Sequence, residues 1–218
     1  MIFYNQDREV VTEFPKDKPR CCFLMTQLGK PLPDKVVEIR NKLKTQLKKR
    51  HIELIDAETF ITGKDFLSKI WKIIFSVPFG IAIVCEKMPS STISNIFYEI
   101  GILNSLGKET IVIKTKGYIV PSDFIRTEYL EYNKSFDKKI NKFLNTLFEL
   151  AEHYDKMADS LEANPLLSID YWRRAYLITG DQKYLDKAKK MFKNNKFDSQ
   201  SKHFIKCFLI NKPVKAKV

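Results

Sequence analysis

Several motifs that define large enzyme classes are missing from this chain of 218 residues. It has no G-x-x-x-x-G-K-[ST] phosphate loop and no G-x-G-x-x-G run, which excludes P-loop ATPases and ordinary NAD dehydrogenases. The longest apolar stretch, Ile73–Cys85, is interrupted by Pro78 and Gly80 and is too short to span a bilayer. The first ten residues, MIFYNQDREV, lack a basic segment followed by an apolar one, so we expect no secretory signal and no membrane association.

Cysteine and histidine are also scarce. The four cysteines are Cys21, Cys22, Cys85 and Cys207; three of them sit in apolar runs and none forms a C-x-x-C pair. They are therefore predicted to be buried, reduced thiols of a cytoplasmic protein. The three histidines lie far apart in the sequence, so neither a metal site nor a bound cofactor is expected.

Apolar and aromatic residues, in contrast, are abundant. Hydrophobic residues make up 44% of the chain, with 16 Phe and 9 Tyr, which is enough to offset the entropy lost on ordering the chain. A chain of this length buries roughly 70% of its unfolded surface, so it needs no disulfide or metal to hold a core. The length indicates one domain, or one domain with an appendage.

Residues 1–133 alternate apolar runs with helical stretches. Strands are predicted at 21–25, 52–56, 79–85, 110–114 and 129–132, and helices at 34–49, 64–76 and about 95–106. The first four strands begin 27–31 residues apart, which is the length of a βαβ unit and requires a parallel sheet. We therefore predict a three-layer α/β domain, Rossmann- or flavodoxin-like, over residues 1–133.

Residues 134–218 contain no convincing strand. Helices are predicted near 135–161, 165–179, 181–194 and 199–210, with stops at Asn164-Pro165 and Gly180-Asp181. Residues 158–191 faintly resemble a single two-helix repeat, which cannot bury its own apolar face alone. We predict an all-helical C-terminal extension that packs on the α/β domain or on another subunit, either as structural cover or as an interaction element.

The net charge of +12 is concentrated near the C-terminus. Residues 183–218 hold eleven lysines and two acidic residues, a net charge of +9. Such a basic region attracts an acidic partner or nucleic acid. The alternative is a solvated lysine-rich face, since no aromatic-interleaved basic motif accompanies it.

One carboxylate stands out in the most apolar predicted helix. Within residues 96–106 (IFYEIGILNSL) the single charged residue is Glu99. Ser94 is expected to cap this helix, which would place Glu99 just past its first turn and beside the carboxyl ends of the strands. Gly101 is expected where the helix approaches a strand closely. Because a buried carboxylate is costly unless it is paired or faces a polar cavity, Glu99 is either a catalytic group suited to sugar chemistry or a glutamate that pairs with a basic residue or turns to solvent.

The carboxyl ends of parallel strands form the ligand crevice of such a sheet, here through loops 26–33, 57–63, 86–94 and 115–128. The candidate substrate-binding residues in or near these loops are Thr26, Gln27, Asp56, Glu58, Glu86, Asn95, Tyr98 and Asp123. Tyr98 either stacks on a base or is a core or rim aromatic. Asp56 either binds substrate or serves a cap or turn at the end of its strand.

The residues around Glu99 form a pattern that continues into the next strand. Residues 94–101 (SNIFYEIG) followed by 106–113 (LGKETIVI) are similar to N-x-F-Y-E-L-G-x-A-x-x-x-G-K-x-x-I-x-I, the signature of nucleoside 2-deoxyribosyltransferase-like proteins. These are relatives, in fold, of bacterial Toll/interleukin-1-receptor (TIR)-like domains. Residues 62–71 (TGKDFLSKIW), Val120–Phe124 (VPSDF) and Tyr132 resemble the family's other landmarks. The likeness covers about residues 20–133.

The resemblance implies N-glycosidic bond chemistry on a nucleoside, a nucleotide or NAD. In active relatives the glutamate that matches Glu99 attacks or stabilises C1′ of the sugar as the base leaves, because an adjacent carboxylate stabilises the oxocarbenium-like state. Water then completes hydrolysis, or a second base completes transfer. Glu86 stands where related sequences often carry an aspartate. The resemblance also implies a homo-oligomer, since relatives often complete the crevice with a neighbouring subunit, and a regulatory or defence role by analogy with TIR-like proteins.

Three functions stay open at this point. The first is an N-glycosidase or deoxyribosyltransferase-like enzyme, which the isolated Glu99 favours. The second is a non-catalytic nucleotide-binding sensor that signals through its helical C-terminal region, which the replacement at Glu86 favours. The third is a basic interaction protein with an α/β scaffold, which the lysine-rich C-terminal segment favours.

Overall fold

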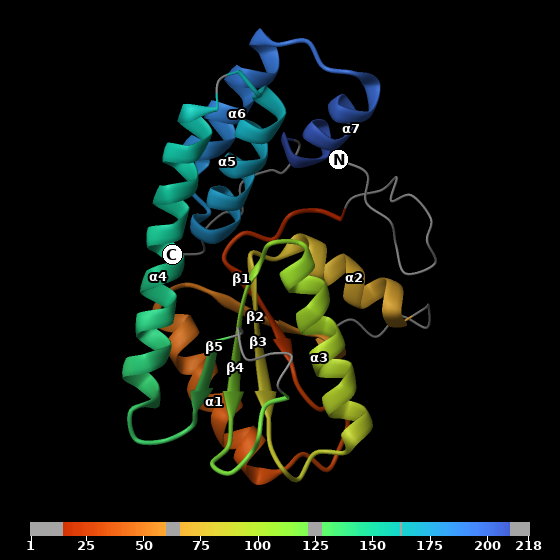
Figure 1. Cartoon of the computed structure of the whole chain (residues 1–218), viewed down its shortest axis with the longest axis vertical. Coiled ribbons are helices and arrows are strands. Elements are labelled where there is room, and N and C mark those ends of the chain that lie inside the picture. The colour runs from red at the N-terminus through yellow and green to blue at the C-terminus, as the bar shows by residue number, and fades with distance from the viewer. Residues whose placement is uncertain (1–14, 60–65, 122–127, 162, 210–218) are drawn as a thin grey trace. The chain divides into compact units, whose positions relative to one another are not determined.

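The computed structural model describes residues 15–59, 66–121, 128–161 and 163–209 (Figure 1). These residues divide into two compact units. The sheet unit comprises 21–59, 79–121 and 128–145, and the helical unit comprises 15–20, 66–78 and the described residues from 146 to 209. The boundary expected near residue 133 stays a prediction of the sequence.

The sheet unit is built on five parallel strands in the order β2-β1-β3-β4-β5. The strands are β1 (Cys21–Met25), β2 (Glu53–Asp56), β3 (Phe79–Val84), β4 (Glu109–Lys114) and β5 (Glu128–Glu131). Every residue of β1 and β3 is buried, as continuous apolar runs covered on both faces should be. The predicted α/β class with a Rossmann-like parallel sheet is confirmed.

Helices cover both faces of this sheet. They are α1 (Asp34–Lys49), α3 (Ser90–Ser105) and the first part of α4 (Phe136–Ser160), with a short 3-10 helix, η1 (Ala57–Thr59). The ring of Phe79 lies 6.1 Å from that of Phe143 in α4, whereas the next residue, Gly80, faces Leu103 in α3. Successive residues of a strand point to opposite faces, so α3 and the start of α4 lie on opposite sides of the sheet.

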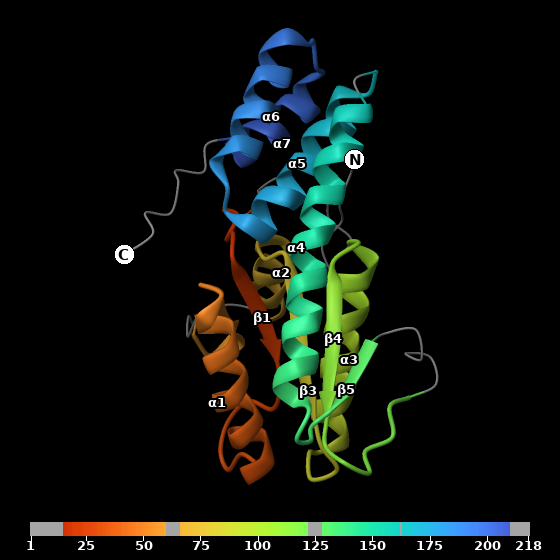
Figure 2. The ribbon, with the colours of Figure 1, turned by 90° about the vertical axis from the view of Figure 1, so that its left-hand side faces the viewer.

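Helix α1 shares its side of the sheet with α4. Asn141 in α4 donates a hydrogen bond of 3.1 Å to the side-chain oxygen of Gln46 in α1, and Figure 2 shows both helices across the sheet from α3. Val36, Ile39 and Leu43 of α1 are fully buried, and their spacing of three or four residues is what predicted this amphipathic helix.

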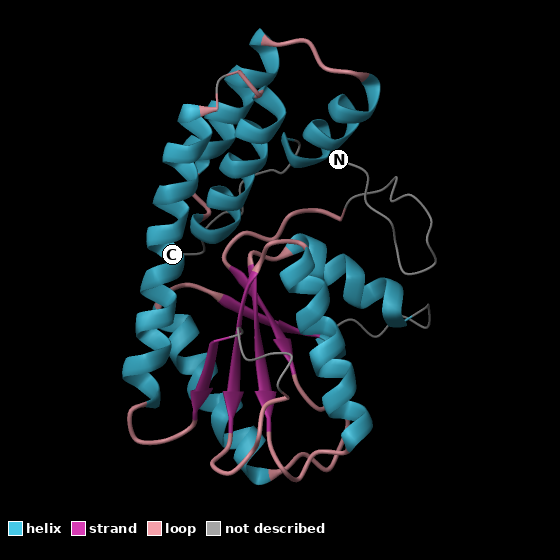
Figure 3. Ribbon diagram, in the orientation of Figure 1, coloured by secondary structure: helices cyan, strands magenta, loops and turns pink. Residues whose placement is uncertain are grey.

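The helical unit contains α2 (Phe66–Ser76), the rest of α4, α5 (Pro165–Thr179), α6 (Gln182–Asn194) and α7 (Ser199–Leu209) (Figure 3). The Asn164 side chain accepts a hydrogen bond from the backbone N–H of Leu167 and caps α5, which begins with Pro165. Gly180 ends α5 in the left-handed conformation, at φ 70°, and Asp181 caps α6. Both predicted stops are confirmed, and the described residues from 134 to 209 contain helices and no strand, as expected.

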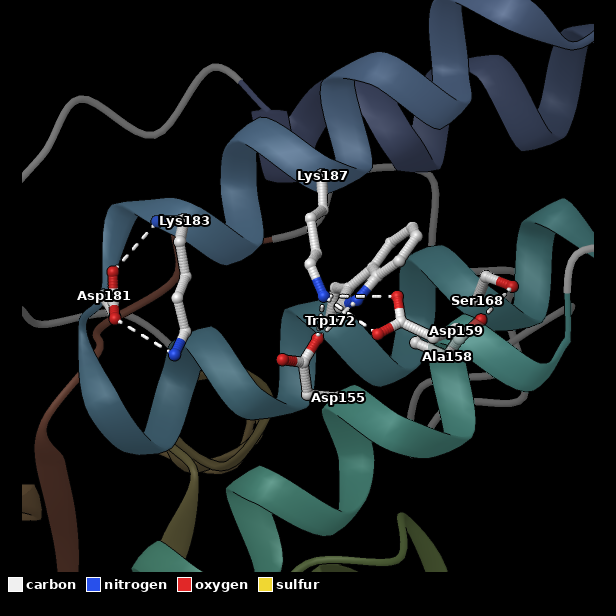
Figure 4. A network of polar contacts seen from close by, with 8 residues as sticks. All are labelled: Asp155, Ala158, Asp159, Ser168, Trp172, Asp181, Lys183 and Lys187. Carbon is white, nitrogen blue, oxygen red and sulfur yellow. Dashed lines mark hydrogen bonds and ion pairs between the residues drawn. The ribbon is translucent and has the colours of Figure 1, made fainter.

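A polar network joins α4, α5 and α6 (Figure 4). The ammonium of Lys187 lies 2.7 Å from an oxygen of Asp155 and 3.0 Å from an oxygen of Asp159, and it also lies over the ring of Trp172. The indole N–H of Trp172 donates to the same carboxylate of Asp155 at 3.0 Å. These contacts fix α5 and α6 against the part of α4 that belongs to this unit.

The segment before β1 is held by a buried ion pair inside the helical unit. Arg173 of α5 donates two hydrogen bonds to Asp17, at 2.5 and 3.0 Å, and a third to the carbonyl of Phe75 in α2. The Asp17 side chain is only 3% exposed. The backbone N–H of Lys18 donates to the carbonyl of Ser76, so residues 17 and 18, α2 and α5 meet at one place.

Helix α3 differs from its prediction at its start. It begins at Ser90 rather than near residue 95, so the connection after β3 spans Cys85–Pro89 and not residues 86–94. The expected cap at Ser94 is wrong, because its hydroxyl donates to the carbonyl of Ser90 within the helix. Pro89 precedes the helix directly, with φ −58° and ψ 143°, and the small polar residues after it already belong to the helix.

The close approach between α3 and the sheet occurs at Gly80 and not at Gly101. A Cβ atom on Gly80 would lie 2.5 Å from a methyl of Leu103 and 2.8 Å from that of Met25, whereas one on Gly101 would meet no atom within 4 Å. The predicted role of Gly101 is therefore wrong, since its position in the helix is exposed.

This difference predicts opposite effects for the same substitution. Gly101→Ala should raise the free energy of unfolding by about 0.5–1 kcal/mol. The reason is that alanine leaves the unfolded chain less conformational freedom than glycine does, and it fits the exposed helix position without a clash. Gly80→Ala should lower it by about 1–2 kcal/mol, because buried side chains must shift. Urea unfolding of both variants beside the unchanged protein measures this, and a stabilising Gly80→Ala would contradict the packing described.

Candidate functional site

The loop after β1 contains two predicted binding residues, and both contact the protein itself. The hydroxyl of Thr26, which is buried, lies 3.5 Å from the carbonyl oxygen of Ile83 in β3 and donates to it. The side-chain N–H of Gln27 donates to the carbonyl of Pro31 at 3.1 Å, while its oxygen is buried with no hydrogen bond to a described residue. These contacts hold the loop against the carboxyl end of the sheet.

The carboxylates after β2 are also engaged. Asp56 is buried at the end of β2 and forms an ion pair with Arg40 of α1. Glu58 of η1 accepts a hydrogen bond of 2.8 Å from the backbone N–H of Gly29. Glu58 thus ties the loop after β1 to the segment after β2, and Asp56 ties β2 to α1. Their assignment as substrate-binding residues stays a prediction of the sequence.

Glu86, which follows β3, is a third carboxylate at this edge, after Asp56 and Glu58. It is exposed, and it accepts a hydrogen bond of 2.5 Å from the hydroxyl of Thr115, the residue after β4. This hydrogen bond lowers the pKa of Glu86 below its usual value. Thr115 was not singled out from the sequence, although its position directly after a strand places it in a predicted crevice loop.

Cys85 and Tyr118 lie close to Glu86. Burial raises the pKa of the Cys85 thiol, and the neighbouring Glu86 charge raises it further, so this thiol is protonated near neutral pH. Burial together with Cys85 raises the pKa of Tyr118. This corner of the sheet therefore presents a thiol, a phenol and one carboxylate.

Glu99 lies in the middle of α3 on the flank of its buried face and is itself half-buried. Its neighbours on the helix, Ile96, Ile102 and Leu103, are all buried. Burial raises the pKa of Glu99 to about 8, and among the residues that the structure describes none donates a hydrogen bond to its carboxylate or forms an ion pair with it. Glu99 is therefore mostly protonated at pH 7.

The position of Glu99 along α3 separates it from the carboxyl edge. With a rise of 1.5 Å per residue, Glu99 lies about 14 Å along the axis from Ser90, where α3 begins. Leu103, one turn further, faces Gly80 near the amino end of β3. Glu99 thus lies alongside β3, whereas Thr26, Gln27, Glu58 and Glu86 lie at the ends of the strands.

The remaining predicted residues are distributed as follows. Asn95 and Tyr98 are both exposed on α3: Asn95 lies one turn before Glu99, and Tyr98 lies next to it. Because Tyr98 is 54% exposed, it is not a core aromatic. Asp123 lies outside the described residues. Arg40 was not found from the sequence, because its partner Asp56 belongs to a different element.

The raised pKa of Glu99 makes a prediction about stability and pH. A carboxyl with a pKa of about 8 in the folded state and 4.5 in the unfolded state binds its proton more tightly when folded, so its stabilising effect is complete below pH 4.5 and is lost as the pH rises to 8. Glu99→Gln has no such loss. Its free energy of unfolding relative to the unchanged protein should rise by about 2–3 kcal/mol between pH 5.5 and pH 8.5.

Urea unfolding at the two pH values measures this difference. Glu109→Gln, which removes an exposed carboxylate at the start of β4, is the matched control and should show no such rise. An equal response of the two variants would mean that Glu99 is solvated.

The part of the chain that the structure describes bears on cysteine burial, metal-binding clusters and membrane-spanning helices. Cys21, Cys22 and Cys85 are buried thiols, as predicted, while the Cys207 side chain lies outside the description. Within the described ranges, no group of three or more His, Cys, Asp or Glu side chains is arranged to hold a metal ion. None of the helices assigned there combines the length and apolar character needed to cross a membrane.

Comparisons with known proteins give no match to a protein-family model and none to a curated protein. Two solved structures are similar. The 2-deoxyribosyltransferase of Bacillus psychrosaccharolyticus is 11% identical, over 54% of this chain and 89% of its own, with a TM-score of 0.42. The CMP N-glycosidase BcmB of Clostridium botulinum is 17% identical, over 56% of this chain and 98% of its own, with a TM-score of 0.42. The first of these structures carries the name of the family that the sequence around Glu99 resembles.

Proposed function

We propose that this chain cleaves or transfers the N-glycosidic bond of a nucleoside, a nucleotide or NAD, with Glu99 as its acid–base group. The observation that carries the proposal is a carboxyl on an apolar helix, with a pKa raised to about 8 by burial and no described partner. Desolvated carboxyl groups of this kind are typical of catalytic acids. The sequence around Glu99 resembles the family's glutamate motif, which supports Glu99 as the residue that acts at the glycosidic bond.

The protonation state decides how Glu99 would act. With adenine or a pyrimidine, the neutral carboxyl donates its proton at pH 7 to a nitrogen or carbonyl oxygen of the departing base as the C1′–N bond breaks and its electron pair passes to the base. Nicotinamide is already cationic and leaves as a neutral base without this proton. The carboxylate left behind stabilises the oxocarbenium-like sugar. Water then attacks C1′ and gives one proton to Glu99, or a second base attacks C1′ through a ring nitrogen and gives its N–H proton to Glu99.

Two exposed side chains on α3 fit the binding of such a substrate. Tyr98 and Asn95 flank Glu99 on the outer side of the helix, where an aromatic ring can stack on a base and an amide can pair with its edge. Glu86 lies at the carboxyl edge of the sheet, apart from Glu99, and has no role in this arrangement. These roles belong to the proposal and require that the substrate reach Glu99 from the α3 side.

A substrate panel tests the proposal. The protein is incubated at high concentration with NAD, ribonucleosides, deoxyribonucleosides and their nucleotides, with and without an added acceptor base, and released bases and exchanged nucleosides are separated by chromatography. Release or exchange from at least one member is expected. No product from any member would overturn the enzymatic proposal.

A second candidate is a module that binds a nucleotide without cleaving it and signals through its helical part, in a regulatory or defence role. The separation of Glu99 from the carboxyl edge favours it, as do the contacts that already engage Asp56, Glu58 and Glu86. Calorimetric titration with the same panel distinguishes the two candidates: saturable binding without base release supports the sensor.

A further inference from the structure

The helical unit carries more positive charge on α6 and α7 than its acidic residues neutralise. Residues 183–206 hold eight lysines and two acidic residues, a net charge of +6. Both acidic residues are engaged: Asp186 pairs with Lys189 at 3.8 Å, and Asp198 accepts backbone hydrogen bonds at the start of α7. The excess charge is therefore local to these two helices and to the connection between them, where Lys196 lies.

Three of the eight lysines are neutralised within the protein. Lys189 pairs with Asp186, and Lys183 lies 3.5 Å from an oxygen of Asp181. Lys187 lies between Asp155 and Asp159, as Figure 4 shows together with the Lys183 pair. These lysines serve the packing and capping of the helices.

The other five are exposed and form no ion pair with any acidic residue in the described ranges. We call them the lysine surface: Lys190, Lys193, Lys196, Lys202 and Lys206. Helical spacing puts Lys190 and Lys193 opposite the residues of α6 that are buried, Tyr184, Leu185 and Ala188, so both ammonium groups point to solvent.

We propose that the lysine surface binds the phosphate backbone of nucleic acid without reading its base sequence. An acidic protein partner would require an apolar centre for its interface, and α6 and α7 carry none of the exposed large hydrophobic residues found among the described residues. A lipid surface would require an apolar helix face to insert, and the apolar face of α6 is buried. Charge without apolar surface suits closely spaced phosphates.

Salt dependence follows from this proposal. Five lysines that displace counterions from duplex DNA give a slope of about −3 to −4.5 for the logarithm of the binding constant against the logarithm of salt concentration. Duplexes of unrelated sequence should bind equally well. The proposal is independent of the N-glycosidic activity, because it involves none of the residues assigned to that site.

The test uses the full chain and fluorescence anisotropy with a labelled 20-base-pair DNA duplex between about 50 and 200 mM salt. The triple variant Lys190→Gln, Lys193→Gln, Lys196→Gln should bind at least about tenfold more weakly at the low-salt end, with a slope reduced by about 2–3. The control is Lys44→Gln, Lys48→Gln, Lys49→Gln, which removes the same charge from three exposed lysines of α1 and should change affinity less than about twofold.

The outcomes decide between alternatives. An equal loss in both triple variants would show that net charge alone attracts DNA, and it would overturn the assignment to α6 and α7. Absence of salt-dependent binding would overturn the proposal outright, as would stronger retention on anionic vesicles than on the duplex. Circular dichroism of each variant confirms that the helices remain.

Discussion

Replacing Glu99 with glutamine is expected to lower the rate of base release by about 10²–10⁴-fold, because the amide keeps the shape of the carboxyl but has no proton to transfer. The same chromatographic assay, on whichever panel member the unchanged protein cleaves, measures the loss. Glu109→Gln, which replaces an exposed carboxylate in β4, should retain full activity. A fully active Glu99→Gln would show that another group supplies the proton.

The pH dependence separates the two possible roles of this carboxyl. If Glu99 donates a proton, the rate of the unchanged protein falls above pH 8, where the carboxyl ionises. If Glu99 acts as an ionised nucleophile, the rate instead rises with pH up to about 8. Loss of the pH 8 transition in Glu99→Gln, measured at whatever rate remains, assigns that transition to this residue.

Replacing Arg173 with methionine is expected to lower the free energy of unfolding by about 3–5 kcal/mol, because it leaves the charge of Asp17 buried without its partner. The Asp17 and Arg173 side chains are 3% and 14% exposed, so water cannot replace the lost hydrogen bonds. The change also removes the hydrogen bond to the carbonyl of Phe75. Urea unfolding gives the magnitude.

The neighbouring residue offers a matched control. Arg174 pairs with Asp170 one turn away on the same helix, with side chains 29% and 19% exposed. Arg174→Met should cost less, about 1–2 kcal/mol, because its pair with Asp170 is more exposed than the Asp17 pair, although Arg174 also interacts with Tyr154. The double variant Asp17→Leu, Arg173→Met should recover most of the stability. Equal losses for the two arginines would contradict the burial of the Asp17 pair.

The helices and strands were largely predictable because their signals are local. The buried runs of β1 and β3 are continuous in the sequence, and Asn164-Pro165 and Gly180-Asp181 act within a few residues of where they stand. The start of α3 was missed because a serine serves equally well as a helix cap or inside a first turn, and only the path of the chain after Pro89 decides between them.

The site was predictable in part for the same reason. Glu99 could be singled out from the sequence as the one charge on an apolar helix, and its raised pKa agrees with that interpretation. The sequence could not predict which groups contact the other carboxylates, because each contact joins residues from different elements. Arg40 pairs with Asp56, Gly29 donates to Glu58 and Thr115 donates to Glu86.

The sequence by itself determined the order of the elements, the parallel sheet, the excess of lysine near the C-terminus and the isolation of Glu99. Tertiary structure alone decided that Glu99 lies alongside β3 rather than at the ends of the strands, and that Asp17 joins the helical unit. The reason is physical: hydrophobic periodicity and turn chemistry act over a few residues, whereas the burial and pairing of a charge depend on segments brought together from distant parts of the chain.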